Sequence, residues 1–482
     1  MNICIFDIES LGSDTAYSSI AEFAAILYSD DFKELDRINI RCRIPEGEIP
    51  QCAALLINRL DIKTLTSANY SHYQLINEVQ KTFTKWSPCI FIGFSSIHFD
   101  EEMLRKEFFK NLHYPFLTNT RSPNKPISNK RHDALNILRS AYATDKNFIK
   151  TELNEKGNVT MKLESISRLA GLDTTRSHSA IVDVKNTKFF LEKVFKEKPD
   201  IWKSAIKTNS KESTENLVKQ ELMFTSCEYY YGRERLHAVA PLHSDFLKHP
   251  VYQYLQVVDL RADIENIIKL SREELKEEMK KVPKFLRSIR QAKAPVILHI
   301  NYALKEEPYN VMKRSLLEKR ATIVKNNKEF GEKISSILLE IAEEKLQTQD
   351  QSDIDEVNSI YKKFTPSKDN ALMYKWHNLS WEDKLKSLDR FTDDRLVNFG
   401  KKIIYQEAPQ ILPASMNKEI MRDIARRILS EEKQKWWTVK EFYHECDNLR
   451  QKAEEENDQN KLKFLNEIND YVERVEKKYI NA

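Results

Sequence analysis

The sequence predicts an α/β domain at its N-terminal end, a small β-rich segment in the middle and a helical C-terminal part. Over the first 200 residues, short apolar β-branched runs alternate with amphipathic segments, which is typical of strands covered by helices. Aromatic and β-branched runs separated by turn residues follow at about 222–301, and the spacing beyond Pro308 is helical. We therefore expect three domains, at residues 1–200, 201–350 and 360–482.

Length and composition exclude several classes of protein. The chain has 482 residues, 41% of them hydrophobic, which is enough for two to four domains of about 100–200 residues each. No apolar run reaches the roughly 18–20 residues that cross a bilayer, and the start, MNICIFDIES, lacks the layout of a signal peptide. The 6 cysteines form no CxxC pair, so we expect no zinc site. These features predict a cytoplasmic protein that does not contact membranes.

The elements of the first domain follow from its apolar runs. Strands are predicted at 3–8 (ICIFDI), 20–28 (IAEFAAILY) and 89–94 (CIFIGF), because each run is short and rich in β-branched or aromatic residues. Helical spacing predicts helices at about 100–111, 133–143, 161–171 and 178–197.

The remaining elements are predicted in the same way. Residues 206–220 are polar and are expected to connect two domains. The runs FTSCEYYYG, RLHAVAPL, YLQVVDL and PVILHIN predict a small antiparallel barrel or sheet, with a charged helical insertion at about 271–291. The turn-rich stretch at 364–370 is a candidate boundary.

A helix–helix seam is predicted near the C-terminal end. Apolar residues recur there at 3,4,3,4 spacing, namely Leu465, Ile468, Val472, Val475 and Tyr479. A single short seam is more typical of packing inside one domain than of dimerisation. We therefore expect a monomer.

Two carboxylates lie near the end of the first predicted strand. Asp7 and Glu9 are two residues apart, so their side chains point to the same face of the strand. Two unpaired charges there cost several kcal/mol, and a divalent cation with hard oxygen ligands removes that cost. The alternative is that the strand has already ended and both side chains face water.

Three further residues stand at element boundaries. Asp100 follows a predicted strand directly, where α/β folds place their sites, although an Asp at that position also suits a helix N-cap. His178 and Asp183 lie at the start of the long helix, where the alternative is that the helix dipole alone favours them. The combination of four acids and one histidine predicts a site for two Mg²⁺ ions, with Mn²⁺ as a substitute, and His178 as the general base.

These residues resemble the motifs of a known superfamily. DIESLG at 7–12, GFSSIHFDEEML at 93–104 and HSAIVDVKNT at 178–187 are similar to the three motifs of the DEDD 3′→5′ exonucleases, in the subclass with a histidine. The segments EFAAI, HAVAPL, VVDL, PVILHIN and FTPSKDNALMY further resemble the bacterial exonuclease I family. That resemblance implies a ribonuclease H-like exonuclease domain, an SH3-like β-barrel domain and an all-helical C-terminal domain.

The resemblance also implies an activity and roles for residues. It implies metal-dependent 3′→5′ hydrolysis of single-stranded DNA, with release of 5′-mononucleotides in DNA repair. Asp7, Glu9 and Asp183 would hold the metals and Asp100 would assist. The residues implied to contact the strand are Glu9, Phe99, Arg105, Arg139 and Lys162.

The sequence departs from the family pattern at several positions. Lys162 stands where the family has an Arg, Ser96 where it has an Asn, and Leu11 where it has a Phe. A lysine keeps the charge of the arginine but loses its two-pronged contact with phosphate. The loop at about 117–131 lacks the family's tryptophans.

The middle segment has features of a nucleic-acid groove. Residues 201–345 carry 26 Lys and Arg against 21 Asp and Glu, and FTSCEYYYGRERLH places three tyrosines beside two arginines. Stacking on aromatic rings combined with basic side chains suits single-stranded DNA, so we expect Tyr231 and Arg233 to contact the strand. The alternatives are a solvated surface for the charges and a barrel core for alternate tyrosines.

One partner and three other functions remain open. The resemblance implies recruitment by the acidic C-terminal tail of single-stranded-DNA-binding protein, which ends in an apolar residue and needs a basic rim around an apolar pocket. A 3′→5′ exoribonuclease or a proofreading-type nuclease would use the same motifs. A non-catalytic nucleic-acid-binding protein is a further alternative, which the presence of all four acids and the histidine disfavours.

Overall fold

The computed structural model describes residues 1–119, 128–175, 178–348 and 355–481. The chain divides into two compact units, of which the first contains Met1–Asn129, Thr175–Lys185 and Asp353–Ala482. The second contains Lys130–Thr174 and Asn186–Ser352. The three-domain division drawn from the sequence therefore stays a prediction. Within the described ranges, none of the helices combines the length and the apolar character that a membrane span requires.

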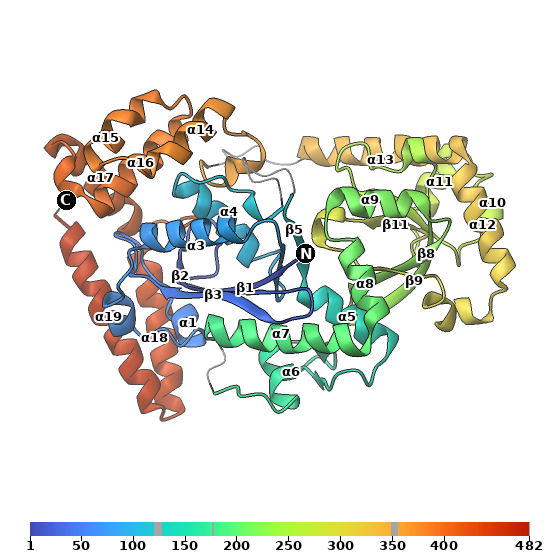
Figure 1. Ribbon diagram of the computed structural model, residues 1–482, viewed down its shortest axis with the longest axis horizontal. Helices are drawn as coiled ribbons and strands as arrows, with labels where there is room; N and C mark the ends of the chain where they lie inside the picture. Colours follow the sequence, from blue (N-terminus) through green and yellow to red (C-terminus); the bar gives the residue numbers. More distant parts are fainter. Residues whose placement is uncertain (120–127, 176–177, 349–354, 482) are drawn as a thin grey trace. The chain divides into compact units, whose positions relative to one another are not determined.

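The first unit is built on a sheet whose strands run in the order β3-β2-β1-β4 (Figure 1). These are β1 (Ile3–Ser10), β2 (Ile20–Tyr28), β3 (Glu34–Arg41) and β4 (Ile90–Gly93). Strand β1 pairs antiparallel with β2 and parallel with β4, and β2 pairs antiparallel with β3. The apolar runs in β1, β2 and β4 are buried as predicted, because the sheet is covered by helices and its inner strands have little access to water.

Helices cover this sheet and form the core with it. They include α1 (Cys52–Ile57), α2 (Ile62–Thr66), α3 (His72–Trp86) and α4 (Asp100–Lys110). Helices α3 and α4 lie on the same face of the sheet (Figure 1), and Phe83 of α3 contacts Phe6, Phe23 and Phe91 with ring centroids 4.4–5.9 Å apart. These contacts fix α3 against the strand that carries Asp7 and Glu9.

One glycine allows the chain to turn from β4 into α4. A Cβ atom on Gly93 would lie 2.4 Å from the Cβ of Ser96 and 3.0 Å from the carbonyl oxygen of Phe6, distances that side chains do not tolerate. The carbonyl oxygen of Ser96 then accepts the N–H of Glu101 at 2.9 Å. The first residue of α4, Asp100, is thereby held close to the end of β1.

The C-terminal part of the first unit is helical, as predicted. Its helices are α14 (Ser367–Trp376), α15 (Trp381–Ser387), α16 (Asp394–Glu407), α17 (Ala414–Ile428), α18 (Val439–Glu455) and α19 (Gln459–Tyr479). In α19 the predicted seam residues Leu465, Ile468 and Val472 are fully buried in a core shared with α18. The seam packs within its own unit, as expected.

The second unit contains an antiparallel sheet in the order β11-β10-β9-β8-β12. Its strands are β8 (Phe224–Tyr230), β9 (Arg233–Pro241), β10 (Leu255–Asp259), β11 (Leu286–Ile289) and β12 (Ile297–Leu298). The short strands β5 (Lys130–Asp133), β6 (Glu152–Leu153) and β7 (Val159–Thr160) precede it. This five-stranded antiparallel sheet lies where the sequence predicts the SH3-like β-barrel domain.

The second unit also contains the helices α5 (Ala134–Thr144), α6 (Leu163–Leu169), α8 (Pro199–Lys207), α9 (Lys211–Gln220), α10 (Ile264–Ile267), α11 (Arg272–Glu278), α12 (Arg314–Asn326) and α13 (Lys328–Thr348). Helix α7 (Ala180–Glu197) begins in the first unit.

Two sequence expectations about the second unit need correction. The stretch 206–220 is not merely a connector, because Ser210 caps α9 by accepting the N–H of Ser213 at 3.1 Å. The insertion at 271–291 is helical only at α11, since residues 286–289 form β11 and pair with β10.

Candidate active site

Strand β1 carries the first two predicted site residues. Asp7 and Glu9 lie two residues apart in a strand that continues to Ser10, so both side chains point to the same face. Asp7 is half-buried and Glu9 is 5% exposed. The alternative that the strand has ended and both carboxylates face water is excluded by this burial.

Asp100 is the first residue of α4 and is 8% exposed. The N-cap position of this helix is held by Phe99, whose side chain packs partly against the core under β1. The capping explanation considered for Asp100 is therefore not what the structure shows. Instead, the carboxylate of Asp100 lies close enough to Asp7 to raise the pKa of that residue.

The third group comes from the start of α7. His178 adopts a left-handed backbone conformation, with φ at 65°, which is uncommon for a residue other than glycine. Asp183 follows in the first turn of the helix. One ligand atom each from Glu9, His178 and Asp183 lies within 4.8 Å of the other two. We call these three residues the metal cluster.

Burial and like charge raise the pKa values of the two strand carboxylates. Burial is the largest cause for Glu9, followed by the charges of Asp183 and Glu22, and the pKa of Glu9 reaches about 9. The pKa of Asp7 is also well above its usual value, because Asp7 is buried and because Asp100, Glu9 and Asp183 are close. A group of buried carboxylates that cannot all be ionised without a nearby cation is a strong indication of a cation site.

The donor set fits a divalent metal. The carboxylate oxygens of Glu9 and Asp183 lie within 4.8 Å of each other and of one imidazole nitrogen of His178, which is thus beside the cation site. Asp7 on the same strand as Glu9 and Asp100 on α4 are close enough for their charges to interact. Hard oxygen donors of this kind suit Mg²⁺ and Mn²⁺.

Sequence reasoning missed one acidic residue of this site. Glu22 lies directly opposite Glu9 in the β1–β2 ladder and is 3% exposed. Its carboxylate accepts the backbone N–H of Ala180 at 3.1 Å and forms an ion pair with Arg41 on β3. Glu22 thus joins β2 to the first turn of α7, which carries Asp183. The signal was present in the sequence, since a lone Glu interrupts the otherwise apolar run IAEFAAILY.

The fold and the acidic cluster agree with the family that the chain matches. Residues 4–189 match a family model described as "Exonuclease", and this range contains β1, α4, the start of α7 and all five predicted catalytic residues. Residues 4–189 therefore form an exonuclease-type domain, and the predicted ribonuclease H-like α/β fold is confirmed. Domains of this family depend on metal, which agrees with the metal cluster.

A second match identifies the kind of exonuclease that the chain resembles. Residues 352–475 match the "Exonuclease I C-terminal domain" model. The exodeoxyribonuclease I proteins of Haemophilus influenzae and Escherichia coli are 26% and 24% identical to this chain over 283 and 279 residues. Each of these matches covers 57% of this chain and 57% of the relative, so the chain spans somewhat more than half the length of these relatives.

Solved structures extend the likeness to the whole fold. The exonuclease I of Methylocaldum szegediense aligns with a TM-score of 0.79 at 19% identity, covering 98% of this chain and 99% of that one. The E. coli enzyme in complex with a dA16 oligonucleotide aligns with a TM-score of 0.76 at 20% identity over the same shares. A further exonuclease I structure, described as an "ExoI/SSB-Ct complex", has a TM-score of 0.74 at 19% identity and the same coverage. The resemblance to bacterial exonuclease I is confirmed.

Several residues that were predicted to contact the DNA strand lie in the first unit and are buried. Arg105 is 6% exposed and donates to Glu101 at 2.6 Å, and its guanidinium lies 5.5 Å from the centroid of the Phe116 ring. Leu11 and Ser96, which replace a Phe and an Asn of the family pattern, are each 1% exposed. Leu11 belongs to a hydrophobic core and does not present a stacking surface. Part of the loop at 117–131 lies outside the described residues.

Other predicted contacts lie in the second unit. Lys162 is exposed at the N-cap of α6. Arg139 on α5 stacks on Tyr229, with its guanidinium carbon 3.6 Å from the ring centroid. Tyr231 and Arg233 lie at the turn between β8 and β9, where Tyr231 is 88% exposed with φ at 51°.

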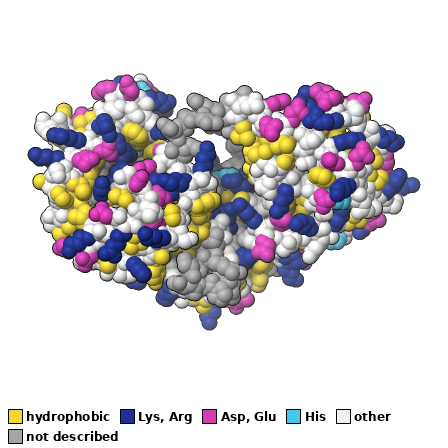
Figure 2. Space-filling model, turned by 90° about the horizontal axis from the view of Figure 1, so that it is seen from above, with side chains coloured by type: hydrophobic (Ala, Val, Ile, Leu, Met, Phe, Trp, Pro, Cys, Tyr) yellow, Lys and Arg dark blue, Asp and Glu magenta, His cyan; other side chains and the backbone are white. Residues whose placement is uncertain are grey.

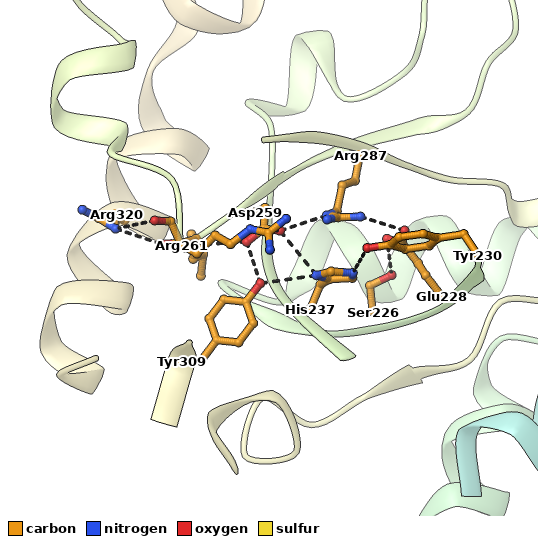
Figure 3. Close-up of polar contacts among 10 residues, drawn as sticks. Ser226, Glu228, Tyr230, His237, Asp259, Arg261, Arg287, Tyr309 and Arg320 are labelled. Carbon is orange, nitrogen blue, oxygen red and sulfur yellow. Dashed lines mark hydrogen bonds and ion pairs between the residues drawn. The ribbon is translucent and has the colours of Figure 1, made fainter. Parts of the chain in front are cut away.

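A largely buried polar network joins the β8–β9 hairpin to β10, β11 and Tyr309 (Figure 3). Tyr230 shares a hydrogen bond of 3.1 Å with Nε2 of His237. The hydroxyl of Tyr309 donates to Asp259 at 2.6 Å, and Asp259 also lies 3.4 Å from Nδ1 of His237. Arg287 donates to Asp259 at 3.0 Å. The tyrosines alternate as expected, because Tyr230 belongs to this network while its neighbours point elsewhere.

On the face that Figure 2 displays, the Lys and Arg side chains do not form one continuous basic patch. Lys and Arg side chains are interspersed there with Asp and Glu, in agreement with a net charge of only +4. On that face the charges resemble an ordinary solvated surface. An argument for DNA contact must therefore rest on individual side chains.

Proposed function

We propose that this protein is a metal-dependent 3′→5′ exonuclease that hydrolyses single-stranded DNA and releases 5′-mononucleotides. The observation that carries the proposal is the metal cluster, in which Glu9, His178 and Asp183 converge within 4.8 Å. It is supported by the match of residues 4–189 to an exonuclease family and by the names of the curated relatives.

Each residue of the site has a role in this proposal. Glu9, Asp7 and Asp183 would hold two Mg²⁺ ions, with Mn²⁺ as a substitute, and Asp100 would complete the set. When bound, the metals supply an acidified water and stabilise the leaving 3′ oxygen. His178 would take the proton from the attacking water as the general base. Glu22 keeps Asp183 in position through Ala180.

The second unit would hold the strand without taking part in the chemistry. Tyr231 offers an exposed ring for a base, and Arg233, exposed beside it at the start of β9, offers a cation for a phosphate. Lys162 and Arg139 would contact the strand as well. We retain the three-domain organisation at 1–200, 201–350 and 360–482, a monomeric state, a cytoplasmic location and a part in DNA repair as elements of the proposal.

A pocket in the second unit suits the acidic tail of single-stranded-DNA-binding protein. The pocket measures about 310 Å³ and is lined by apolar side chains, namely Leu217, Leu222, Met223, Ile297 and Leu298. Lys207 and Arg314 contribute cations to its lining and Glu221 and Glu318 contribute carboxylates, with Arg314 paired to Glu318 at 2.8 Å. An apolar tail residue would enter the pocket, and a tail carboxylate would meet Lys207. The exonuclease I structure described with SSB-Ct supports the choice of partner.

Titration with the tail peptide tests this partner. Lys207→Glu should weaken binding by about tenfold or more, because it replaces an attraction by a repulsion. Lys203→Glu, on the same helix but away from the pocket lining, is the matched control. Equal losses in both variants, or no saturable binding at low salt, would remove the pocket assignment.

The proposed function is tested by comparing labelled substrates. Single-stranded DNA, duplex DNA and single-stranded RNA of one sequence are incubated with the full-length protein and Mg²⁺ or EDTA. We expect degradation of the single-stranded DNA only, and only with metal. Preferred degradation of RNA would favour an exoribonuclease, whose specificity depends on room for the 2′-hydroxyl. Binding of DNA without any degradation would favour a non-catalytic protein.

A further inference from the structure

One arginine of the second unit is held against an aromatic ring. Arg139 lies on α5, and Tyr229 is the last residue but one of β8. Helix α5 packs on both strands of the β8–β9 hairpin. The guanidinium carbon of Arg139 lies 3.6 Å from the centroid of the Tyr229 ring, which is the van der Waals distance between two stacked planar groups. The ring therefore supports one face of the guanidinium.

A carboxylate lies beside this contact. Glu234 on β9 is directly opposite Tyr229 in the ladder, so both side chains project from the same face of the sheet. The Glu234 side chain is 5% exposed, and its Oε2 lies 3.8 Å from Nζ of Lys146. The charges of Glu234 and Asp133 both act on Arg139, but Asp133 also caps α5 and Glu234 is shared with Lys146. The two acids thus favour the charged guanidinium without enclosing it.

Only one end of the guanidinium can reach a ligand. Nε of Arg139 is buried and has no hydrogen-bond partner among the residues that the structure describes. The residue as a whole is half-buried, and burial lowers the pKa of Arg139 from its usual value. An anion can therefore reach Arg139 only through its terminal N–H groups, which are the groups that bind a phosphate with two parallel hydrogen bonds.

A fixed guanidinium has a particular use in this chain. Lys162 stands where the family has an arginine, and a lysine offers a phosphate a point charge without the two-pronged geometry. An arginine that is already held in place loses less side-chain freedom when it binds. Arg139 on Tyr229 is such a preorganised group.

We propose that Tyr229 is a positioning residue, which holds the guanidinium of Arg139 in the orientation that contacts a phosphate of the bound strand. The inference rests on the proposed function, in which Arg139 contacts single-stranded DNA. It adds that an uncharged ring controls the strength of an ionic contact. Although Tyr229 is 41% exposed, its ring is occupied by Arg139 and does not stack on a base.

The salt dependence of DNA binding tests this role. Labelled single-stranded DNA is titrated with the full-length protein in Ca²⁺, which prevents turnover. Tyr229→Leu should weaken binding by about three- to tenfold. It should also reduce the slope of log K against log salt by about 1, because a phosphate contact is lost although Tyr229 carries no charge. A lower affinity with an unchanged slope would mean that Tyr229 stacks on a base, and would overturn the proposal.

Two further variants separate positioning from direct contact. Tyr229→Phe keeps the ring and should bind within about twofold of the wild type. Arg139→Gln should weaken binding by about tenfold, because it removes a charge-assisted contact with phosphate. Adding Tyr229→Leu to Arg139→Gln should cause no further loss, since a positioning residue has no effect without the group that it positions. Additive losses in the double variant would overturn the proposal.

A second arginine–tyrosine pair of the same unit supplies the matched control. The guanidinium carbon of Arg290 lies 5.1 Å from the centroid of the Tyr254 ring, and Tyr254→Leu should bind DNA with the affinity and salt slope of the wild type. An equal change in Tyr254→Leu and Tyr229→Leu would overturn the assignment. The single-turnover rate of bound strand in Mg²⁺ should be unchanged in Tyr229→Leu, because the chemistry takes place at the metal cluster. An unchanged thermal unfolding midpoint shows that the lost affinity is not a loss of fold.

Failure of this inference can be distinguished from failure of the proposed function. If the wild type binds and degrades the strand while Tyr229→Leu matches it in affinity and salt slope, only the positioning role is removed. If the wild type does not bind single-stranded DNA, the proposed function is removed and this inference with it.

Discussion

Glu22 faces Glu9 across the β1–β2 ladder, and its carboxylate holds the backbone N–H of Ala180 at 3.1 Å. Glu9 belongs to the metal cluster, whereas Glu22 connects that strand pair to the helix that carries Asp183. Residues that orient metal ligands without contacting the metal themselves change metal affinity or activity by about 10–100-fold when they are removed. Glu22 is therefore a positioning residue with a measurable effect.

We predict that Glu22→Ala lowers turnover by about 10–100-fold and raises the metal concentration needed for half-maximal rate. Glu22→Gln should recover much of that loss, because the amide oxygen still accepts the N–H of Ala180. The measurement is the rate of nucleotide release as a function of Mg²⁺ concentration. A merely structural role would instead lower the unfolding midpoint of both variants without changing the metal dependence.

His178→Ala should lower the turnover rate by about 10²–10⁴-fold, the usual contribution of a general base. Affinity for single-stranded DNA, measured in Ca²⁺ to prevent turnover, should stay nearly unchanged. Single-turnover kinetics separate the two effects. If the variant loses affinity while bound strand is still hydrolysed, His178 is a substrate contact and not the base.

Glu107 should make the first unit sensitive to acid. Its side chain is fully buried, and although burial alone would raise its pKa, Lys110 and His72 outweigh burial and hold the pKa at about 2. A carboxyl group whose pKa is lower in the folded state stabilises the fold above its unfolded pKa. This contribution is lost as the pH falls from about 4.5 toward 2. The shift corresponds to about 3 kcal/mol.

Glu107→Gln tests this pH dependence. Its free energy of unfolding should lie below that of the wild type by about 2–4 kcal/mol above pH 5, and the difference should shrink as the pH falls below about 4.5. Glu197→Gln is the control, since Glu197 is 53% exposed in its pair with Lys193 and exposed pairs contribute about 0–1 kcal/mol. Denaturant titrations at several pH values give the result. A difference that is independent of pH would contradict the assignment.

The β8–β9 hairpin should contribute to the binding of single-stranded DNA. Tyr231→Ala should weaken binding of single-stranded DNA by the value of one stacked base, about 1–3 kcal/mol. Arg233→Ala should reduce the slope of log K against log salt by about 1. Tyr252→Ala, which removes a 39% exposed ring stacked on Tyr254, is the control. Unchanged affinity and salt dependence would show that the hairpin lies off the path of the strand.

Much of the fold could be predicted because its signals are local. The run ICIFDI gives β1, and the placement of Asp7 and Glu9 within it gives the face that carries the site. Strand β3 was not predicted because ELDRINIR is mostly polar and partly exposed, although the alternation in its second half is a strand signal. Helix α9 was read as a connector because KESTENLVKQ is polar, although Thr214 and Val218 anchor it.

Only those site residues that belong to a sequence motif could be predicted. Glu22 was missed because its role depends on the strand register that places it opposite Glu9 and beside Ala180, and sequence spacing does not contain that register. The contact between Arg139 and Tyr229 was missed for a similar reason. The two residues are far apart in the sequence, and only the packing of α5 on the β8–β9 hairpin brings them together.

The most direct test of the central claim follows one strand from both ends. Single-stranded DNA labelled at either its 5′ or its 3′ end is incubated with the full-length protein, in Mg²⁺ or in EDTA, beside the Asp183→Asn variant. We predict that in Mg²⁺ the 3′ label is released at once as a mononucleotide, while the 5′-labelled strand shortens progressively. EDTA and the variant should stop both. Release of the 5′ label first, or degradation that persists in Asp183→Asn, would contradict a 3′→5′ exonuclease built on Glu9, His178 and Asp183.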